Sequence, residues 1–142
     1  MARATEIFNR TLEQSHEWLL DLMDQLGWTD EHRAQRALKA VLHALRDRLT
    51  VNEAVQLGSQ LPVLIRGYYY EGWKPAGKPL KERHMDEFLG HIDAAFRDEA
   101  VEADLVVRAV FSLLSSRVSR GEIEDVLQIL PKELKELWEL WP

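Results

Sequence analysis

The sequence matches itself when it is shifted by 69 residues, and this internal similarity constrains the fold more than any other feature. Apolar positions stay apolar across the shift, as where Leu19 aligns with Phe88 and Met23 with Ile92. The identical pairs are Leu20, Asp24, Ala34, Ala40, Val41, Leu45, Arg48, Glu53, Leu61 and Pro62, which align with Leu89, Asp93, Ala103, Ala109, Val110, Leu114, Arg117, Glu122, Leu130 and Pro131. Because the matches follow the apolar positions, we interpret the chain as two copies of one helical unit.

The apolar spacing within each copy predicts four helices. In the first copy they cover about 11–26, about 30–49, a short segment after Thr50, and a segment that starts at Pro62. Gly27 suits the left-handed stop of the first helix. Neither copy shows the two-residue alternation of a half-buried strand. We therefore expect an all-α fold, a tandem pseudo-repeat of two four-helix units with about eight helices in total.

Two matching motifs mark the start of the third helix in each copy. Thr50-Val51-Asn52-Glu53 and Ser119-Arg120-Gly121-Glu122 both fit the capping box, in which the hydroxyl accepts from a backbone amide and the glutamate returns to the cap residue. Arg48 and Arg117 end the preceding helices, where a cation favours the carbonyl dipole. These arginines and glutamates are therefore predicted to be structural rather than catalytic.

A segment rich in proline and glycine separates the copies. Residues 72–80 hold two prolines and two glycines in nine positions, which excludes a regular helix. Trp73 and Leu80 are large and apolar, so we expect this segment to lie against the body. We expect one domain over residues 1–142, with unit one at 10–71, a hinge at 72–82 and unit two at 83–141.

Composition limits the classes of function. The 142 residues contain no cysteine, which excludes thiolate zinc sites, iron–sulfur clusters and thiol nucleophiles and fits a reducing compartment. No stretch approaches the length of apolar sequence that spans a membrane, and the first residues lack the apolar run of a signal peptide, so a cytoplasmic location is expected. The net charge of −6 opposes any binding of nucleic acid that depends on bulk charge, so we do not expect a nucleic-acid partner.

Several segments of the sequence resemble a bacterial family catalogued as domain of unknown function 2267 (DUF2267). The segments that carry the resemblance are Glu17-Trp18-Leu19-Leu20, Leu26-Gly27-Trp28, Arg36 to Leu49, Gln60-Leu61-Pro62, Arg66 to Trp73, and Asp86-Glu87-Phe88-Leu89. The resemblance implies a small, cytoplasmic, all-helical bacterial protein. It implies no activity, so no catalytic residue is transferred from the family.

His84, Glu87 and His91 form the sharpest candidate for a metal site. Their i, i+3, i+7 spacing places the three side chains on one face of a predicted helix, and imidazole with carboxylate suits zinc, iron or copper. The alternative is a solvated polar face, because one helix offers no obvious fourth ligand. The trio also belongs to one copy, since the aligned residues are Ser15, Trp18 and Leu22.

Aromatic residues around the hinge are the second candidate, for contact with a ligand or partner. Tyr68 and Tyr69 align with apolar positions of the second copy, Leu137 and Trp138, and are therefore predicted to be core. The residues expected to be free for contact are Tyr70, Trp73 and Lys74, together with Trp141 near the end of the chain. The cations Lys78, Lys81 and Arg83 follow, and aromatic faces beside cations can stack bases or hold anions. Simple packing of the hinge is the alternative.

The motifs of common enzyme classes are absent from the sequence. There is no Gly-x-Ser-x-Gly elbow, His-Glu-x-x-His helix, phosphate loop or dinucleotide fingerprint, so no catalytic residue and no cofactor is expected. We expect a non-catalytic module that binds a protein partner or forms a homo-oligomer. The alternative is a protein, with or without enzymatic activity, that binds a small ligand or metal at the hinge between the two repeats. Contact with nucleic acid through the basic hinge is a third hypothesis.

Overall fold

The computed structural model describes residues 2–97 and 99–139. In these ranges the chain forms helices and no strand, which confirms the all-α prediction. The helices are α1 (Ala2–Leu26), α2 (Glu31–Asp47), α3 (Val51–Ser59), α4 (Val63–Tyr70), α5 (Met85–Ala95), α6 (Ala103–Arg117), α7 (Arg120–Ile129) and α8 (Lys132–Glu139). No helix in the described part of the chain combines the length and apolar character needed to cross a bilayer.

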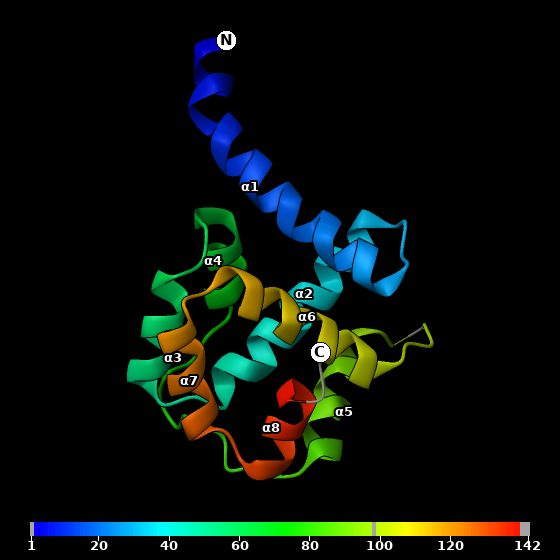
Figure 1. Cartoon of the computed structure of the whole chain (residues 1–142), viewed down its shortest axis with the longest axis vertical. Helices are drawn as coiled ribbons and strands as arrows, with labels where there is room; N and C mark the ends of the chain where they lie inside the picture. Colours follow the sequence, from blue (N-terminus) through cyan, green and yellow to red (C-terminus); the bar gives the residue numbers. More distant parts are fainter. Residues whose placement is uncertain (1, 98, 140–142) are drawn as a thin grey trace.

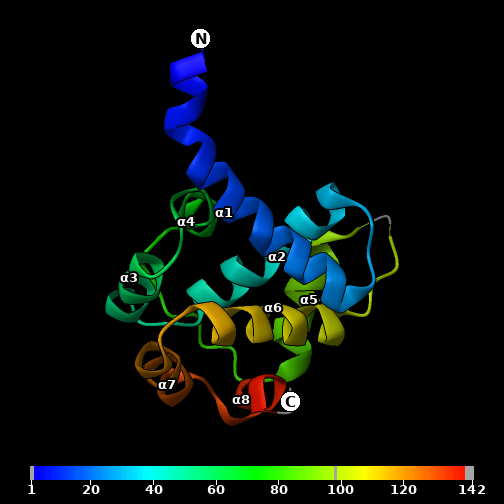
Figure 2. The same ribbon diagram turned by 45° about the horizontal axis from the view of Figure 1, so that its top comes forward.

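The first helix is longer than the sequence pattern predicts. It begins at Ala2 rather than near Thr11, because residues 2–10 contain alanine, arginine and glutamate, which favour a helix, while their only large apolar residues, Ile7 and Phe8, are too few to show a helical spacing by themselves. It ends where expected, at a turn in which Gly27 has a φ of 68°. The N-terminal half of α1 projects away from the rest of the molecule (Figures 1 and 2).

Helices α2 and α6 form the centre of the structure. Both have buried apolar residues at three- and four-residue spacing, such as Leu38, Leu42 and Leu45 in α2 and Val107 and Phe111 in α6. Helix α1 packs against α6 as well as α2, and α5 packs against α2 as well as α6. The two halves of the chain therefore share one core.

Polar contacts also join the two halves. Arg33 and Arg36 of α2 form ion pairs with Glu99, at 3.3 and 3.1 Å. Arg117 at the end of α6 pairs with Asp21 of α1. Because of these ion pairs and the shared apolar core, neither half of the chain packs separately from the other.

A buried arginine holds α4 in place. Arg46 is 4% exposed, and its Nη1 donates to the backbone oxygens of Tyr69 at 2.7 Å and Glu71 at 3.0 Å. These oxygens lie at the C-terminal end of α4, where the helix has no internal donors for its last carbonyls. The Tyr69 hydroxyl in turn donates to Ala54 in α3 at 2.7 Å. Helix α4 is thus fixed to both α2 and α3.

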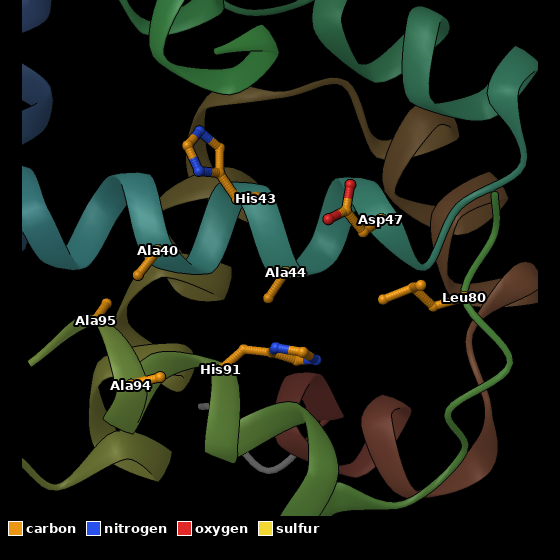
Figure 3. Close-up of a pocket in the computed structure, with 8 residues that line it drawn as sticks. All are labelled: Ala40, His43, Ala44, Asp47, Leu80, His91, Ala94 and Ala95. Carbon is orange, nitrogen blue, oxygen red and sulfur yellow. The ribbon is translucent and has the colours of Figure 1, made fainter. Parts of the chain in front are cut away.

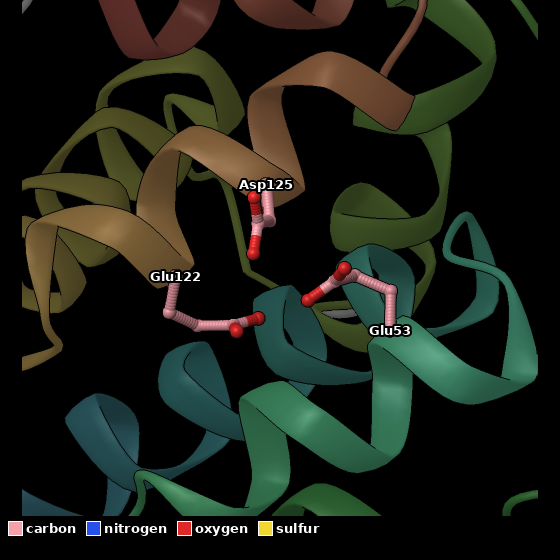
Figure 4. A group of neighbouring side chains, drawn as sticks. All are labelled: Glu53, Glu122 and Asp125. Carbon is pink, nitrogen blue, oxygen red and sulfur yellow. The ribbon is translucent and has the colours of Figure 1, made fainter.

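The predicted capping boxes form only in part. The hydroxyls of Thr50 and Ser119 accept from the amides of Glu53 and Glu122, at 3.2 and 3.3 Å, as expected. The two glutamate side chains do not return to the cap residues, because α3 packs against α7 and the carboxyl groups face each other there (Figure 4). The reciprocal half of both boxes was therefore a wrong prediction.

Candidate functional site

One apolar stripe follows α1 from the body of the molecule into solvent. Phe8, Leu12, Ser15, Leu19 and Leu22 recur at alternating four- and three-residue spacing, which puts them on one helix face. Leu22 is completely buried and Ser15 is buried, whereas Leu12 is 51% exposed and Phe8 is 61% exposed. The body therefore covers the stripe only from about Ser15 onward.

A groove between α1 and α4 continues this stripe. Its cavity measures about 400 Å³, and its lining is mainly apolar: Leu12, Glu13, Ser15, His16, Leu19, Leu64 and Tyr68. The Tyr68 hydroxyl at the floor accepts from Gln35 Nε2 at 2.8 Å, and His16 at the edge lies 2.8 Å from Glu31. Ser15, His16 and Tyr68 have hydrogen-bond partners within the protein, so apart from the Glu13 carboxylate the groove presents mostly carbon to solvent. Such a surface favours contact with another apolar face.

A second cavity, of about 320 Å³, lies between α2 and α5. Figure 3 shows the His91 ring directed into this space, with Ala44 and Leu80 beside it, while the His43 ring points to the other side of α2. His43 Nε2 lies 2.6 Å from the backbone oxygen of Tyr68. Burial lowers the pKa of His43 below its ordinary value, which favours the neutral imidazole that donates this bond.

The three predicted metal ligands are not gathered into one site. His84 Nδ1 lies 2.7 Å from Glu133, whose hydrogen bond raises the pKa of the imidazole, and His91 Nε2 lies 2.8 Å from Glu82. Glu87 accepts from the backbone amide of His84 at 3.2 Å, which caps α5. Each of the three groups thus has a separate partner. Within the described residues, the ligand atoms of these three side chains do not all lie within 4.8 Å of one another.

The aromatic residues at the hinge pack on the body. Tyr69 is completely buried, which confirms its predicted core position, while Tyr68 is only partly covered and lines the groove. Tyr70 and Trp73 are both partly buried, with ring centroids 5.5 Å apart. Lys74 is exposed. Trp141, the fourth residue predicted to make contacts, lies outside the described residues.

A close approach between α3 and α4 explains the position of Tyr70. A Cβ at Gly58 would lie 2.7 Å from Tyr70 Cζ and 3.1 Å from Tyr69 Cε2, so only glycine leaves room for the two rings. The tip of the Tyr70 ring therefore lies over Gly58, and the side chain is only partly exposed. This contact is invisible in the helix pattern of the sequence, where Gly58 is one ordinary residue of a short helix.

Acidic side chains meet at the contact of α3 with α7, where the sequence did not predict a site. Figure 4 shows Glu53 from α3 facing Glu122 and Asp125 from α7, and the ligand oxygens of all three lie within 4.8 Å of one another. Burial raises the pKa of Glu122 to about 8, with further contributions from the hydrogen bond and the charge of Glu53. This raised pKa favours the protonated form of Glu122 at neutral pH, in which its hydroxyl can donate to Glu53. The available signal was the identity of the two glutamates across the 69-residue shift.

A comparison with models of known protein families identifies the family of this chain. A family model described as "Uncharacterized conserved protein (DUF2267)" matches residues 15–137. The chain belongs to the DUF2267 family. This match confirms the resemblance noted in the sequence, and no curated protein matches the chain. The DUF2267 match begins at Ser15, where the body starts to cover α1, so the exposed positions Phe8 and Leu12 precede the matched region.

Proposed function

We propose that this DUF2267 chain is a non-catalytic module that self-associates through α1. The observation that carries the proposal is the apolar stripe of α1, which continues beyond the body and leaves Phe8 and Leu12 in solvent. Ile7, 74% exposed, widens the uncovered surface. Burying a side chain of this size is worth about 1.5–3 kcal/mol, so the uncovered residues together form a substantial binding surface.

A second copy of the chain is the occupant that fits this surface best. Alternating three- and four-residue spacing is the pattern that pairs two helices side by side, and a second α1 presents the same stripe. In an antiparallel pair centred near Leu12, Phe8 of one copy would approach the groove between α1 and α4 of the other. Arg10 of one copy would then lie near Glu13 of the other, which adds opposite charges at the rim. The resulting interface is self-complementary, as in most two-fold dimers.

Light scattering coupled to size-exclusion chromatography tests this proposal. We expect the wild-type chain to be a dimer at about 100 μM, and the double variant Phe8→Glu/Leu12→Glu to be a monomer that keeps the same helical content. The matched control is Val55→Glu/Leu105→Glu, which places the same charges on exposed apolar residues of α3 and α6. A monomeric wild-type chain would refute self-association, and a monomeric control would show that the effect is not specific to α1.

We also propose that the two halves of the chain are copies of one helical unit. The proposal is supported by the element boundaries, since α3 and α4 shifted by 69 residues become 120–128 and 132–139, close to α7 and α8. It is supported further by the reciprocal packing of α1 on α6 and α5 on α2. In an experimental structure, superposition of residues 10–71 on 83–139 should align the four helix axes in order. Failure of that superposition would reject the duplication.

A further inference from the structure

Arg48, at the end of α2, is a buried cation whose hydrogen bonds are incomplete. The residue is 7% exposed, and its Nε and Nη1 are buried without a hydrogen-bond partner. A buried guanidinium without partners is unfavourable, because the protein does not replace the water that it has lost. The position therefore differs from that of a structural arginine such as Arg46, whose donors are used.

The 69-residue shift shows which partner is missing. Arg48 aligns with Arg117, and Arg117 is paired with the carboxylate of Asp21. The residue that aligns with Asp21 is Gly90, which has no side chain to offer. Arg48 therefore occupies the place of a paired arginine in a copy that lacks the paired carboxylate.

The neighbouring carboxylates are committed to other groups. Burial lowers the pKa of Arg48, and the charges of Glu82 and Glu87 act in the opposite direction, so both lie within electrostatic reach. Glu82, however, is hydrogen-bonded to His91, and Glu87 accepts from the amide of His84. Neither forms an ion pair with Arg48 within 4.0 Å in the described part of the chain, which leaves room for an external anion.

An open cavity of about 640 Å³ lies beside Arg48 and is walled by the hinge. The lining includes Arg48, Lys78, Pro79, Leu80, Lys81 and Arg83. No acidic side chain contributes to this lining among the described residues, although the whole chain has a net charge of −6. The amide of Leu80 donates to the backbone oxygen of Asp47 at 2.8 Å, which fixes the hinge against the end of α2 and keeps the cations near Arg48.

We propose that this cavity, the Arg48 cavity, binds a small molecule that carries a phosphate group. Four cations line the cavity without an acidic side chain among them, which favours an anion with more than one negative charge, and the guanidinium offers the paired donors that a phosphate accepts. The volume lies within the range of small-molecule sites. The anion occupies the role that Asp21 has for Arg117. This binding is independent of self-association through α1.

Titration calorimetry of the full chain with inorganic pyrophosphate tests the proposal. We expect saturable binding at low ionic strength that weakens as salt is added, because the attraction is largely electrostatic. The variant Lys81→Ala/Arg83→Ala removes two exposed cations of the Arg48 cavity and should weaken binding by about tenfold or more. The control Arg120→Ala/Lys132→Ala removes the same net charge from α7 and α8, away from the cavity, and should bind as the wild-type chain does.

Arg48→Met provides a second test that separates binding from folding. Since two nitrogens of Arg48 have no partner, the apolar replacement should raise or preserve the melting temperature of the free chain. The same variant should lose the increase in melting temperature that pyrophosphate gives the wild-type chain. Absence of pyrophosphate binding to the wild type at about 10 mM would overturn the proposal. Equal loss in the Arg120→Ala/Lys132→Ala control, or tighter binding of malonate than of pyrophosphate, would overturn it as well.

Discussion

The carboxyl groups of Glu53 and Glu122, two residues 69 positions apart in the sequence, meet where α3 packs on α7 and share a hydrogen bond. Both side chains are buried, and each has one oxygen without a partner. Two adjacent carboxylates would repel each other strongly in such surroundings, so the pair keeps a proton on Glu122. The α3–α7 contact therefore depends on the protonation of one residue.

This pair predicts a pH dependence of folding stability. The pKa of Glu122 rises from 4.5 to about 8 on folding, so the folded chain binds this proton more tightly than the unfolded chain does. Its contribution to stability is complete below pH 4.5 and is lost as pH rises towards 8 and beyond. The variant Glu122→Gln keeps a donor for Glu53 without an ionisable group. Near pH 9 the variant should be more stable than the wild type by about 1–3 kcal/mol, and its free energy of unfolding should change less with pH between the two pKa values. Urea denaturation across this range measures the difference, and parallel curves for the two proteins would contradict the assignment.

Arg46 and Arg48 should respond in opposite ways to the same substitution. Arg46→Met leaves the carbonyls of Tyr69 and Glu71 without their donor and should destabilise the fold by about 2–4 kcal/mol. Arg48→Met should be neutral or stabilising, as argued above. The exposed control Arg36→Met removes a surface ion pair with Glu99 and an exposed contact with the Phe96 ring, and it should cost about 1 kcal/mol or less. Thermal or urea unfolding of the three variants checks the order, and a similar loss in Arg46→Met and Arg36→Met would show that Arg46 does not hold α4.

The contact of Gly58 with Tyr70 can be measured by a double-mutant cycle. Gly58→Ala introduces a methyl group against the two tyrosine rings and should destabilise the chain by about 1–3 kcal/mol. In a Tyr70→Ala background the same substitution should be neutral or stabilising by up to about 1 kcal/mol, because alanine favours the helix. Urea denaturation of the four proteins gives the coupling free energy. A coupling near zero would mean that Tyr70 is not packed over Gly58.

Removal of the exposed part of α1 should separate folding from association. A chain without residues 1–13 retains the buried positions of α1, such as Trp18 and Leu22, and should keep a melting temperature within a few degrees of the full chain measured as a monomer. It should also be monomeric at concentrations where the full chain is a dimer. Calorimetry and light scattering check the two statements. A large loss of cooperativity would show that the projecting segment belongs to the folding unit.

Most of the fold follows from patterns that are local in sequence. The apolar spacing of α2 predicts both its extent and its buried face, and the hydroxyls of Thr50 and Ser119 are N-caps as expected. The beginning of α1 was placed too late because residues before Thr11 form a helix on propensity and have little apolar pattern. The Glu53 and Glu122 side chains were assigned to local caps, since the sequence does not show that α3 and α7 are neighbours.

The candidate sites were harder to predict because each joins residues that are distant along the chain. The spacing of His84 and His91 predicted one helix face, but His84 is the extended N-cap residue that precedes α5. The partners of the two imidazoles, Glu133 and Glu82, come from other segments. Tyr70 was expected to be free for contact because it lies outside the apolar positions of its own helix, α4. Its ring lies over Gly58 of α3, and the sequence does not show that these two residues are neighbours.

Sequence alone determined the helical class, the order of the helices and the existence of a non-helical hinge, because these depend on spacing, caps and backbone preference within a few residues. Tertiary structure decided which charges are paired. Arg117 and Arg48 align across the 69-residue shift and lie at the ends of α6 and α2, yet one has a carboxylate and the other lines a cavity. The energy of a buried charge depends on the groups that surround it in space, and those groups come from helices that the chain brings together only on folding.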